Sequence, residues 1–126
     1  MLFRSIFDQI LYYFNQSISL KNKKALVTAG PTYENIDPVR FIGNHSSGKM
    51  GVEIAEVLSG RGADVILILG PSSIHIPANI KQVIRVQTAA EMHHECALRA
   101  ADQNILVMAA AVADYRPVKK IGRAHV

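Results

Sequence analysis

Residues 44–49 (NHSSGK) place two hydroxyl groups and a lysine directly before a helical pattern. They follow a short apolar run at residues 25–27 (ALV) and a turn signal at Gly30 and Pro31. An apolar run that ends at such a signal predicts a buried strand. A loop that leads from a strand to the start of a helix is where nucleotide-binding α/β folds hold phosphates.

The spacing of these residues does not select one class of site. It lacks the two glycines and the Lys-Ser or Lys-Thr pair of a P-loop, and it lacks the first close glycine pair of a dinucleotide fingerprint. The pattern alone therefore indicates either an anion near a helix start or a tight turn whose serines cap the helix.

Longer motifs are more specific. Residues 28–32 (TAGPT), 37–42 (DPVRFI) and 44–51 (NHSSGKMG), followed by residues 110–117 (AAVADYRP), occur in this order. They resemble the signatures of the phosphopantothenate–cysteine ligase family, and the resemblance covers roughly residues 20–118. In bacteria this domain is usually the C-terminal half of a bifunctional enzyme whose N-terminal half is a flavin-dependent decarboxylase.

The resemblance implies a ligase of coenzyme A biosynthesis that joins 4'-phosphopantothenate to cysteine. CTP, with Mg²⁺, would be a substrate that activates the carboxylate as an acyl-cytidylate. FMN would belong only to the decarboxylase domain. The intact enzyme would be a cytoplasmic homodimer or higher oligomer that binds neither nucleic acid nor membrane.

Two residues are the catalytic candidates that the resemblance implies. The side-chain amide of Asn44 offers two donors and one acceptor for the acyl-nucleotide. The guanidinium of Arg40 suits bidentate recognition of a carboxylate or phosphate. Without the resemblance, the sequence favours a turn residue for Asn44 and a solvated surface residue for Arg40.

The remaining candidates bind rather than react. Residues expected to bind phosphate or substrate are Gly30, Pro31, Thr32, Ser46, Ser47, Gly48 and Lys49. Residues expected to bind the nucleotide are Met108, Ala109, Ala110 and Asp114. No metal site is expected, because the adjacent His93 and His94 diverge on a helix and are taken as surface residues. Cys96 is expected to pack in the core.

Alternating strands and helices must position these residues. Apolar runs predict strands at residues 25–28, 63–69, 81–86 and 105–111, and helical patterns cover residues 48–59 and 88–101. This order predicts a Rossmann-like three-layer α/β fold with a mostly parallel sheet, truncated after about four strands. Residues 33–43 and 70–79 are expected to be loops, and residues 88–91 match a capping box.

The first segment has a helical period of its own. Apolar residues at positions 6, 7, 10, 11 and 14 predict an exposed amphipathic helix without a partner, within a linker that spans residues 6–20. A membrane-surface helix is the alternative, which the low basic charge disfavours. Residues 21–120 are expected to form the N-terminal part of the ligase domain.

Both ends of the chain resemble translated adapter DNA. Residues 121–126 (IGRAHV) are what ATC GGA AGA GCA CAC GTC encodes, which after AG is a common sequencing-library adapter. Residues 1–5 (MLFRS) are what GTG CTC TTC CGA TCT encodes, the reverse complement of that adapter. We therefore expect the natural sequence to span residue 6 to about residue 119. A natural short protein with unusual tails is the alternative.

Composition supports a globular α/β protein. Hydrophobic residues make up 49% and charged residues 19% of the 126 residues. The formal net charge is +4, but Arg4, Lys120 and Arg123 lie in or next to the adapter-like ends, so we do not interpret the charge as a nucleic-acid footprint. One cysteine fits a reducing compartment.

Three functional hypotheses remain at this point. The first is the ligase, with little or no activity expected of this chain. The second is a nicotinamide-dependent oxidoreductase, which the absence of closely spaced glycines after the first strand disfavours. The third is a nucleotide-binding fragment without catalysis.

Overall fold

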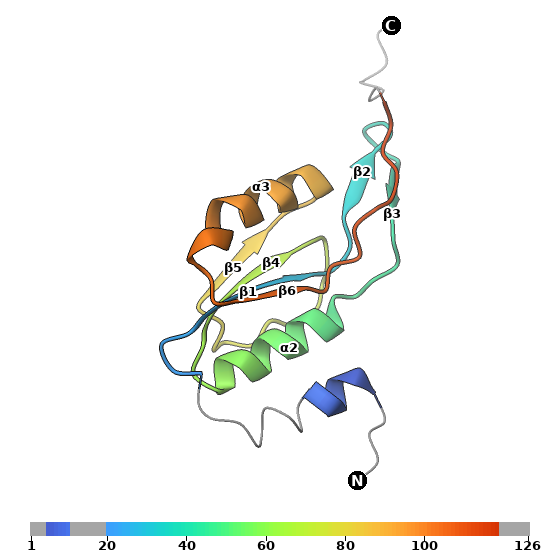
Figure 1. The fold of residues 1–126 in the computed structure, drawn as a ribbon. Helices are drawn as coiled ribbons and strands as arrows, with labels where there is room; N and C mark the ends of the chain where they lie inside the picture. Colours follow the sequence, from blue (N-terminus) through green and yellow to red (C-terminus); the bar gives the residue numbers. More distant parts are fainter. Residues whose placement is uncertain (1–4, 11–19, 119–126) are drawn as a thin grey trace, which may run out of the picture.

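The computed structural model describes residues 5–10 and 20–118 (Figure 1). Its centre is a four-stranded sheet in the order β5-β4-β1-β6, in which all pairs are parallel. The strands are β1 (Lys24–Ala29), β4 (Asp64–Leu69), β5 (Gln82–Arg85) and β6 (Ile105–Met108). The predicted Rossmann-like architecture with a mostly parallel sheet is therefore confirmed.

Two helices cover opposite faces of this sheet and complete the three layers (Figure 1). The first is α2 (Lys49–Gly60), which lies against β1 and β4. The second is α3 (Ala89–Arg99), which continues into the short 3-10 helix η1 (Ala100–Asp102). Both lie where the helical periodicity of the sequence predicted them.

Side-chain alternation in β1 distributes the core between the two faces. Ala25, Val27 and Ala29 belong to the larger cluster with the buried face of α2. Leu26 points the other way and forms a smaller cluster with Ile68 of β4 and Met92 of α3. Each large side chain of this kind contributes about 1.5–3 kcal/mol when fully buried, so the α2 face carries most of the hydrophobic stabilisation.

Residues 33–43, predicted to be a loop, instead contain an antiparallel hairpin. Its strands are β2 (Tyr33–Asn35) and β3 (Phe41–Gly43). The Tyr33 and Phe41 rings stack with centroids 4.1 Å apart. Tyr33 also pairs with Gly43, where a Cβ would lie 2.5 Å from the Tyr33 ring. The glycine therefore makes room for the aromatic ring that holds the hairpin.

The N-terminal segment also differs from prediction. Residues 6–10 are helical, but Phe7 and Ile10 pack against the larger core cluster, so this part of the helix has a partner. The rest of the predicted helix, residues 11–14, lies outside the described residues. The adapter-like ends also lie outside them, apart from Ser5. No helix within residues 5–10 or 20–118 is long and apolar enough to cross a membrane.

Candidate functional site

Three glycines allow the chain to converge at the carboxyl edge of the sheet. Gly30 after β1 and Gly48 before α2 have φ of 81° and 80°. A Cβ on Gly48 would lie 3.2 Å from the Gly30 nitrogen, and a Cβ on Gly70 would lie 1.6 Å from the Pro31 carbonyl oxygen. Side chains at these positions would separate β1, β4 and α2, so the glycines create the junction on which the site stands.

A polar groove of about 430 Å³ opens beside this junction. Ser46, Ser47 and Lys49 line one wall, and the loop after β4 lines the other. The Ser72 hydroxyl in that loop donates a 2.6 Å hydrogen bond to the Ser47 carbonyl oxygen, which joins the two walls. The remaining lining residues are Tyr33, Pro71, Ser73 and Ile74. We call this space the polar groove.

The start of α2 faces this groove without a side-chain cap. Gly48 occupies the N-cap position, and no side chain bonds to the first turn from there. Ser46 Oγ accepts from Gly48 N at 3.3 Å, and Ser47 Oγ accepts from Lys49 N at 3.2 Å. Ser47 thus bonds to the first amide of α2 and Ser46 to the amide before it. Gly48 at the N-cap has no side chain to bond to the second or third amide, so the positive end of the dipole stays available to an anion there.

Asn44 connects two loops in this structure. Its Nδ2 donates to the carbonyl oxygens of Ala111 and Val112 at 3.2 and 3.0 Å. These bonds join the segment before α2 to the segment after β6. The structure therefore brings Asn44 to the residues that follow Ala110.

Arg40 lies apart from the other candidates. It occupies the turn of the β2–β3 hairpin, at the end away from the sheet (Figure 1). Its Nε forms a 2.6 Å ion pair with Asp37 Oδ2, and its side chain is 68% exposed. Hydrogen bonds from the Val39 and Arg40 amides, together with the guanidinium, lower the pKa of Asp37. Arg40 is held on the hairpin and not at the polar groove.

Gly30, Pro31 and Thr32 are buried and shape the site from beneath. Thr32 Oγ1 accepts from Ala113 N at 2.8 Å. Pro31 forms a parallel bridge with Ala111, and Ala111 N donates to the Gly30 carbonyl oxygen at 2.8 Å. None of the three lines the polar groove.

The segment expected to receive the nucleotide is fixed to β1. Ala109 N donates to the Thr28 carbonyl oxygen at 3.1 Å, and Ala110 N donates to Thr28 Oγ1 at 3.3 Å. Asp114 follows this segment and is exposed. The predicted strand through residue 111 ends at Met108, although the Pro31–Ala111 bridge extends its direction.

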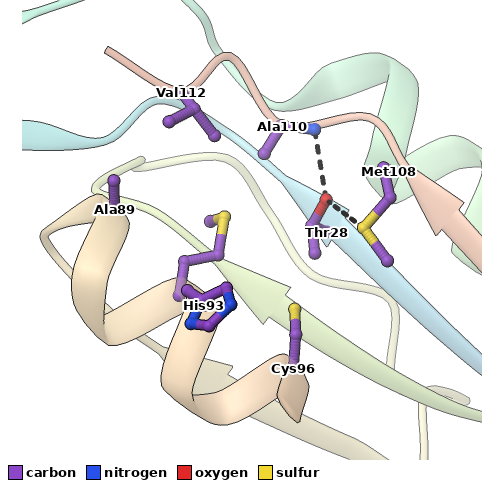
Figure 2. A pocket seen from close by; sticks show the side chains of 8 residues that line it. Thr28, Ala89, His93, Cys96, Met108, Ala110 and Val112 are labelled. Carbon is purple, nitrogen blue, oxygen red and sulfur yellow. Dashed lines mark hydrogen bonds between the residues drawn. The ribbon is translucent and has the colours of Figure 1, made fainter. Parts of the chain in front are cut away.

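A second groove lies between α3 and β6 and is mainly apolar (Figure 2). Its volume is about 370 Å³, and we call it the apolar groove. Its lining residues are Thr28, Ala89, Met92, His93, Cys96, Met108, Ala110 and Val112. Burial raises the pKa of the Cys96 thiol, which suits the packing role predicted for it. His93, predicted to be a surface residue, is exposed and also lines this groove (Figure 2).

Two further residues were not among the candidates. Ser72 lines the polar groove, and the signal for it was its place directly after a neighbouring parallel strand. Glu34 is buried, and its Oε1 accepts from Ala89 N at the start of α3 at 2.9 Å. No local signal predicted Glu34, because its partner lies 55 residues away.

Sequence comparison decides the family. Residues 20–123 match the family described as DNA/pantothenate metabolism flavoprotein C-terminal domain. The chain belongs to this family. Its relatives include the coenzyme A biosynthesis bifunctional protein CoaBC of Vibrio vulnificus, which is 49% identical over 104 residues, 82% of this chain and 26% of that protein. CoaBC of Escherichia coli is 46% identical over 112 residues, 89% of this chain and 27% of that protein.

Solved structures of the same family share the fold. A crystal structure of the C-terminal domain of CoaBC superposes with a TM-score of 0.76 at 44% identity, covering 82% of this chain and 53% of that chain. The flavoprotein from Streptococcus pneumoniae gives 0.71 at 36% identity, covering 76% of this chain and 42% of that chain. The chain thus spans about a quarter of the curated relatives' length and about half of the solved domain.

Proposed function

We propose that this chain is the phosphate- and nucleotide-binding part of a ligase that joins 4'-phosphopantothenate to cysteine through an acyl-cytidylate. The observation that carries the proposal is the polar groove, whose serines and lysine stand at an uncapped helix start. Such a start binds phosphate through backbone amides and the helix dipole. The similarity to CoaBC proteins favours this ligase over a nicotinamide-dependent oxidoreductase.

In the proposed reaction the substrate carboxylate attacks the α-phosphate of CTP, and pyrophosphate leaves. The amine of cysteine then displaces CMP from the acyl-cytidylate and forms the amide. Lys49 and the hydroxyls of Ser46 and Ser47 would neutralise phosphate oxygens in the polar groove. Mg²⁺ would enter with the triphosphate, since the described residues contain no cluster of three acidic, histidine or cysteine ligands.

Asn44 and Arg40 are the proposed catalytic residues. Asn44 Nδ2 would donate to the acyl-cytidylate only by exchanging the Ala111 or Val112 carbonyl oxygen for the ligand, whereas its Oδ1 would accept from the ligand without such an exchange. Arg40 would meet a substrate carboxylate or phosphate through its Nη groups, because its Nε donates to Asp37. Met108, Ala109, Ala110 and Asp114 are proposed to meet the nucleotide. Ala109 and Ala110 would do so through carbonyl oxygens, because both N–H groups bond to Thr28.

The remaining domain organisation is also proposed from the family. FMN would bind a separate decarboxylase domain, and the intact enzyme would be a cytoplasmic homodimer or higher oligomer. The chain itself is expected to bind MgCTP with little or no turnover, because it covers only 53% of the solved CoaBC domain. Pyrophosphate release above a heat-killed blank, with CTP and 4'-phosphopantothenate present, would contradict the expected inactivity.

Calorimetric titration with MgCTP tests the binding proposal. We expect Lys49→Ala to weaken MgCTP binding by about tenfold, or roughly 1.4 kcal/mol, through loss of a charged phosphate contact. Lys81→Ala is the matched control. Lys81 lies just before β5, at the amino edge of the sheet and away from the polar groove at the carboxyl edge, where it pairs with Asp64. NADH should not bind. Equal effects of both variants, or binding of NADH in place of CTP, would refute the proposal.

A further inference from the structure

The loop after β4 forms one wall of the polar groove through residues 71–74. Farther along this loop, Ile74 and Ile76 pack against the larger core cluster. Every hydrogen bond that residues 71–76 make with the described part of the chain involves Ser72. Ser72 is therefore the residue through which hydrogen bonds hold this wall in place.

The hydrogen bonds of Ser72 run in two directions. Its hydroxyl donates to the Ser47 carbonyl oxygen at 2.6 Å and accepts from Ile74 N at 3.1 Å. Its carbonyl oxygen accepts from Arg85 Nη1 at 3.3 Å. A continuous connection thus leads from the end of β5, through the loop, to the serines that precede α2.

The register of the sheet explains how Arg85 reaches this loop. Arg85 ends β5 and pairs with Leu69, the last residue of β4. Val83 packs against the larger core cluster with α2, whereas Ile84 packs against the smaller cluster with α3. Because successive side chains of a strand point to opposite faces, Arg85 shares the face of Val83. That is the face on which α2 lies.

We propose that Arg85 is a positioning residue that holds residues 71–73 as the second wall of the polar groove and so strengthens triphosphate binding. The inference rests on the proposed function, since it names what supports the phosphate-binding wall. Arg85 is not among the residues that line the groove, so it acts through the Ser72 carbonyl oxygen and not on the phosphate. A wall that is in place in a smaller fraction of molecules lowers the apparent affinity by that fraction.

Two substitutions of Arg85 test this role in the full 126-residue chain. Arg85→Met removes the donor, whereas Arg85→Lys keeps a positive charge and a donor for the Ser72 carbonyl oxygen. In calorimetry, we expect Arg85→Met to weaken MgCTP binding by about threefold to tenfold and Arg85→Lys to restore most of it. Lys81→Met is the matched control, because it removes the same charge before the amino end of β5.

Hydrogen exchange followed by mass spectrometry reports on the wall without a ligand. Arg85→Met should speed the exchange of the amides of residues 72–76, and Lys81→Met should not. Ser72→Ala interrupts the same connection at the hydroxyl. The variant that combines Arg85→Met with Ser72→Ala should therefore bind MgCTP about as weakly as the weaker of the two single variants.

Several outcomes would overturn the inference. They are unchanged exchange of residues 72–76 in Arg85→Met, equal losses of affinity in Arg85→Met and Lys81→Met, and losses in Arg85→Met and Ser72→Ala that multiply in full. Unchanged affinity of Arg85→Met, while Lys49→Ala weakens binding, would overturn it as well and leave the proposed function intact. Circular dichroism verifies that each variant folds. Failure of the unmodified chain to bind MgCTP would refute the proposed function, and exchange alone would then decide whether Arg85 holds the loop.

Discussion

The helices α2 and α3 begin in opposite ways, although both start near the carboxyl edge of the same sheet. The N-cap residue is Gly48 in α2 and Thr88 in α3. At the third helical position α2 has Gly51, whereas α3 has Glu91. The start of α3 is therefore closed by a complete capping box, while the start of α2 has no side-chain cap.

The capping box is not the only source of the electrostatic difference between the starts of α2 and α3. The buried carboxylate of Glu34 also accepts from Ala89 N, so the positive end of the α3 dipole already has an acidic partner. At α2 the neighbouring charged side chain is Lys49, which adds positive charge. One helix start is saturated within the fold, and the other is left to attract an anion. The comparison shows that the fold satisfies the dipole of α3 with an acidic side chain and leaves that of α2 without one, which is the basis of the proposed phosphate binding there.

The largest expected effect comes from giving α2 the cap residue of α3. Gly48→Thr should lower the free energy of unfolding by roughly 2–3 kcal/mol, because a β-branched residue is strained at positive φ. Its Cβ would also approach the Gly30 nitrogen at 3.2 Å. Urea denaturation measures the loss. Gly60→Ala is the control, since no atom lies within 4 Å of a Cβ there. An unchanged midpoint for Gly48→Thr would show that α2 tolerates an ordinary cap.

The next-largest effect is expected at Glu34, the acidic partner of the start of α3. Glu34→Ala should cost about 1–3 kcal/mol, because it leaves the Ala89 N–H without its partner. Glu34→Gln should cost less, since an amide oxygen can still accept that hydrogen bond. Thermal unfolding of both variants gives the order. If the glutamine variant is as unstable as the alanine variant, the hydrogen bond is not what Glu34 contributes.

A smaller effect compares the hydroxyls before the two helices. Thr88→Ala should cost about 1 kcal/mol, the usual loss for an N-cap side chain that bonds to the third helical amide. Ser47→Ala should change stability by less than about 0.5 kcal/mol, because it removes only a local turn bond to Lys49 N. Equal losses in urea would remove the distinction between a capped and an uncapped helix.

The smallest effect lies on the hairpin, away from both helices. The Asp37 pKa is lowered from its ordinary value of 3.8 by backbone hydrogen bonds and by Arg40. Its contribution to stability is therefore present above pH 3.8 and is lost as the pH falls through the lower folded pKa. Asp37→Asn should flatten the pH dependence of Tm below about pH 4. A profile as steep as that of the unmodified chain would assign the acid sensitivity to other carboxylates.

Elements with a strong local signal were predictable. Apolar runs between turn residues gave the four parallel strands, and the Thr88–Glu91 pair gave the capping box of α3. The β2–β3 hairpin was missed because three-residue strands are too short to show a period. The packing of Phe7 and Ile10 was missed because periodicity identifies an apolar helix face and not the surface that covers it.

The same division applies to the candidate site. The sequence by itself determined the family, because the order and spacing of the 44–51 and 110–117 motifs are local properties of the chain; the roles of the individual site residues stay predictions. Only the tertiary structure decided that Asn44 bonds to carbonyl oxygens 67 and 68 positions away, that Ser72 closes the polar groove, and that Arg40 is held on the hairpin. The Asn44 and Ser72 contacts depend on the register of β1, β4 and β6 and on glycines that permit close backbone approach. Packing of the whole sheet fixes these distances, and no short stretch of sequence encodes them. The Asp37–Arg40 pair is local, and the tertiary structure decided only where its hairpin lies.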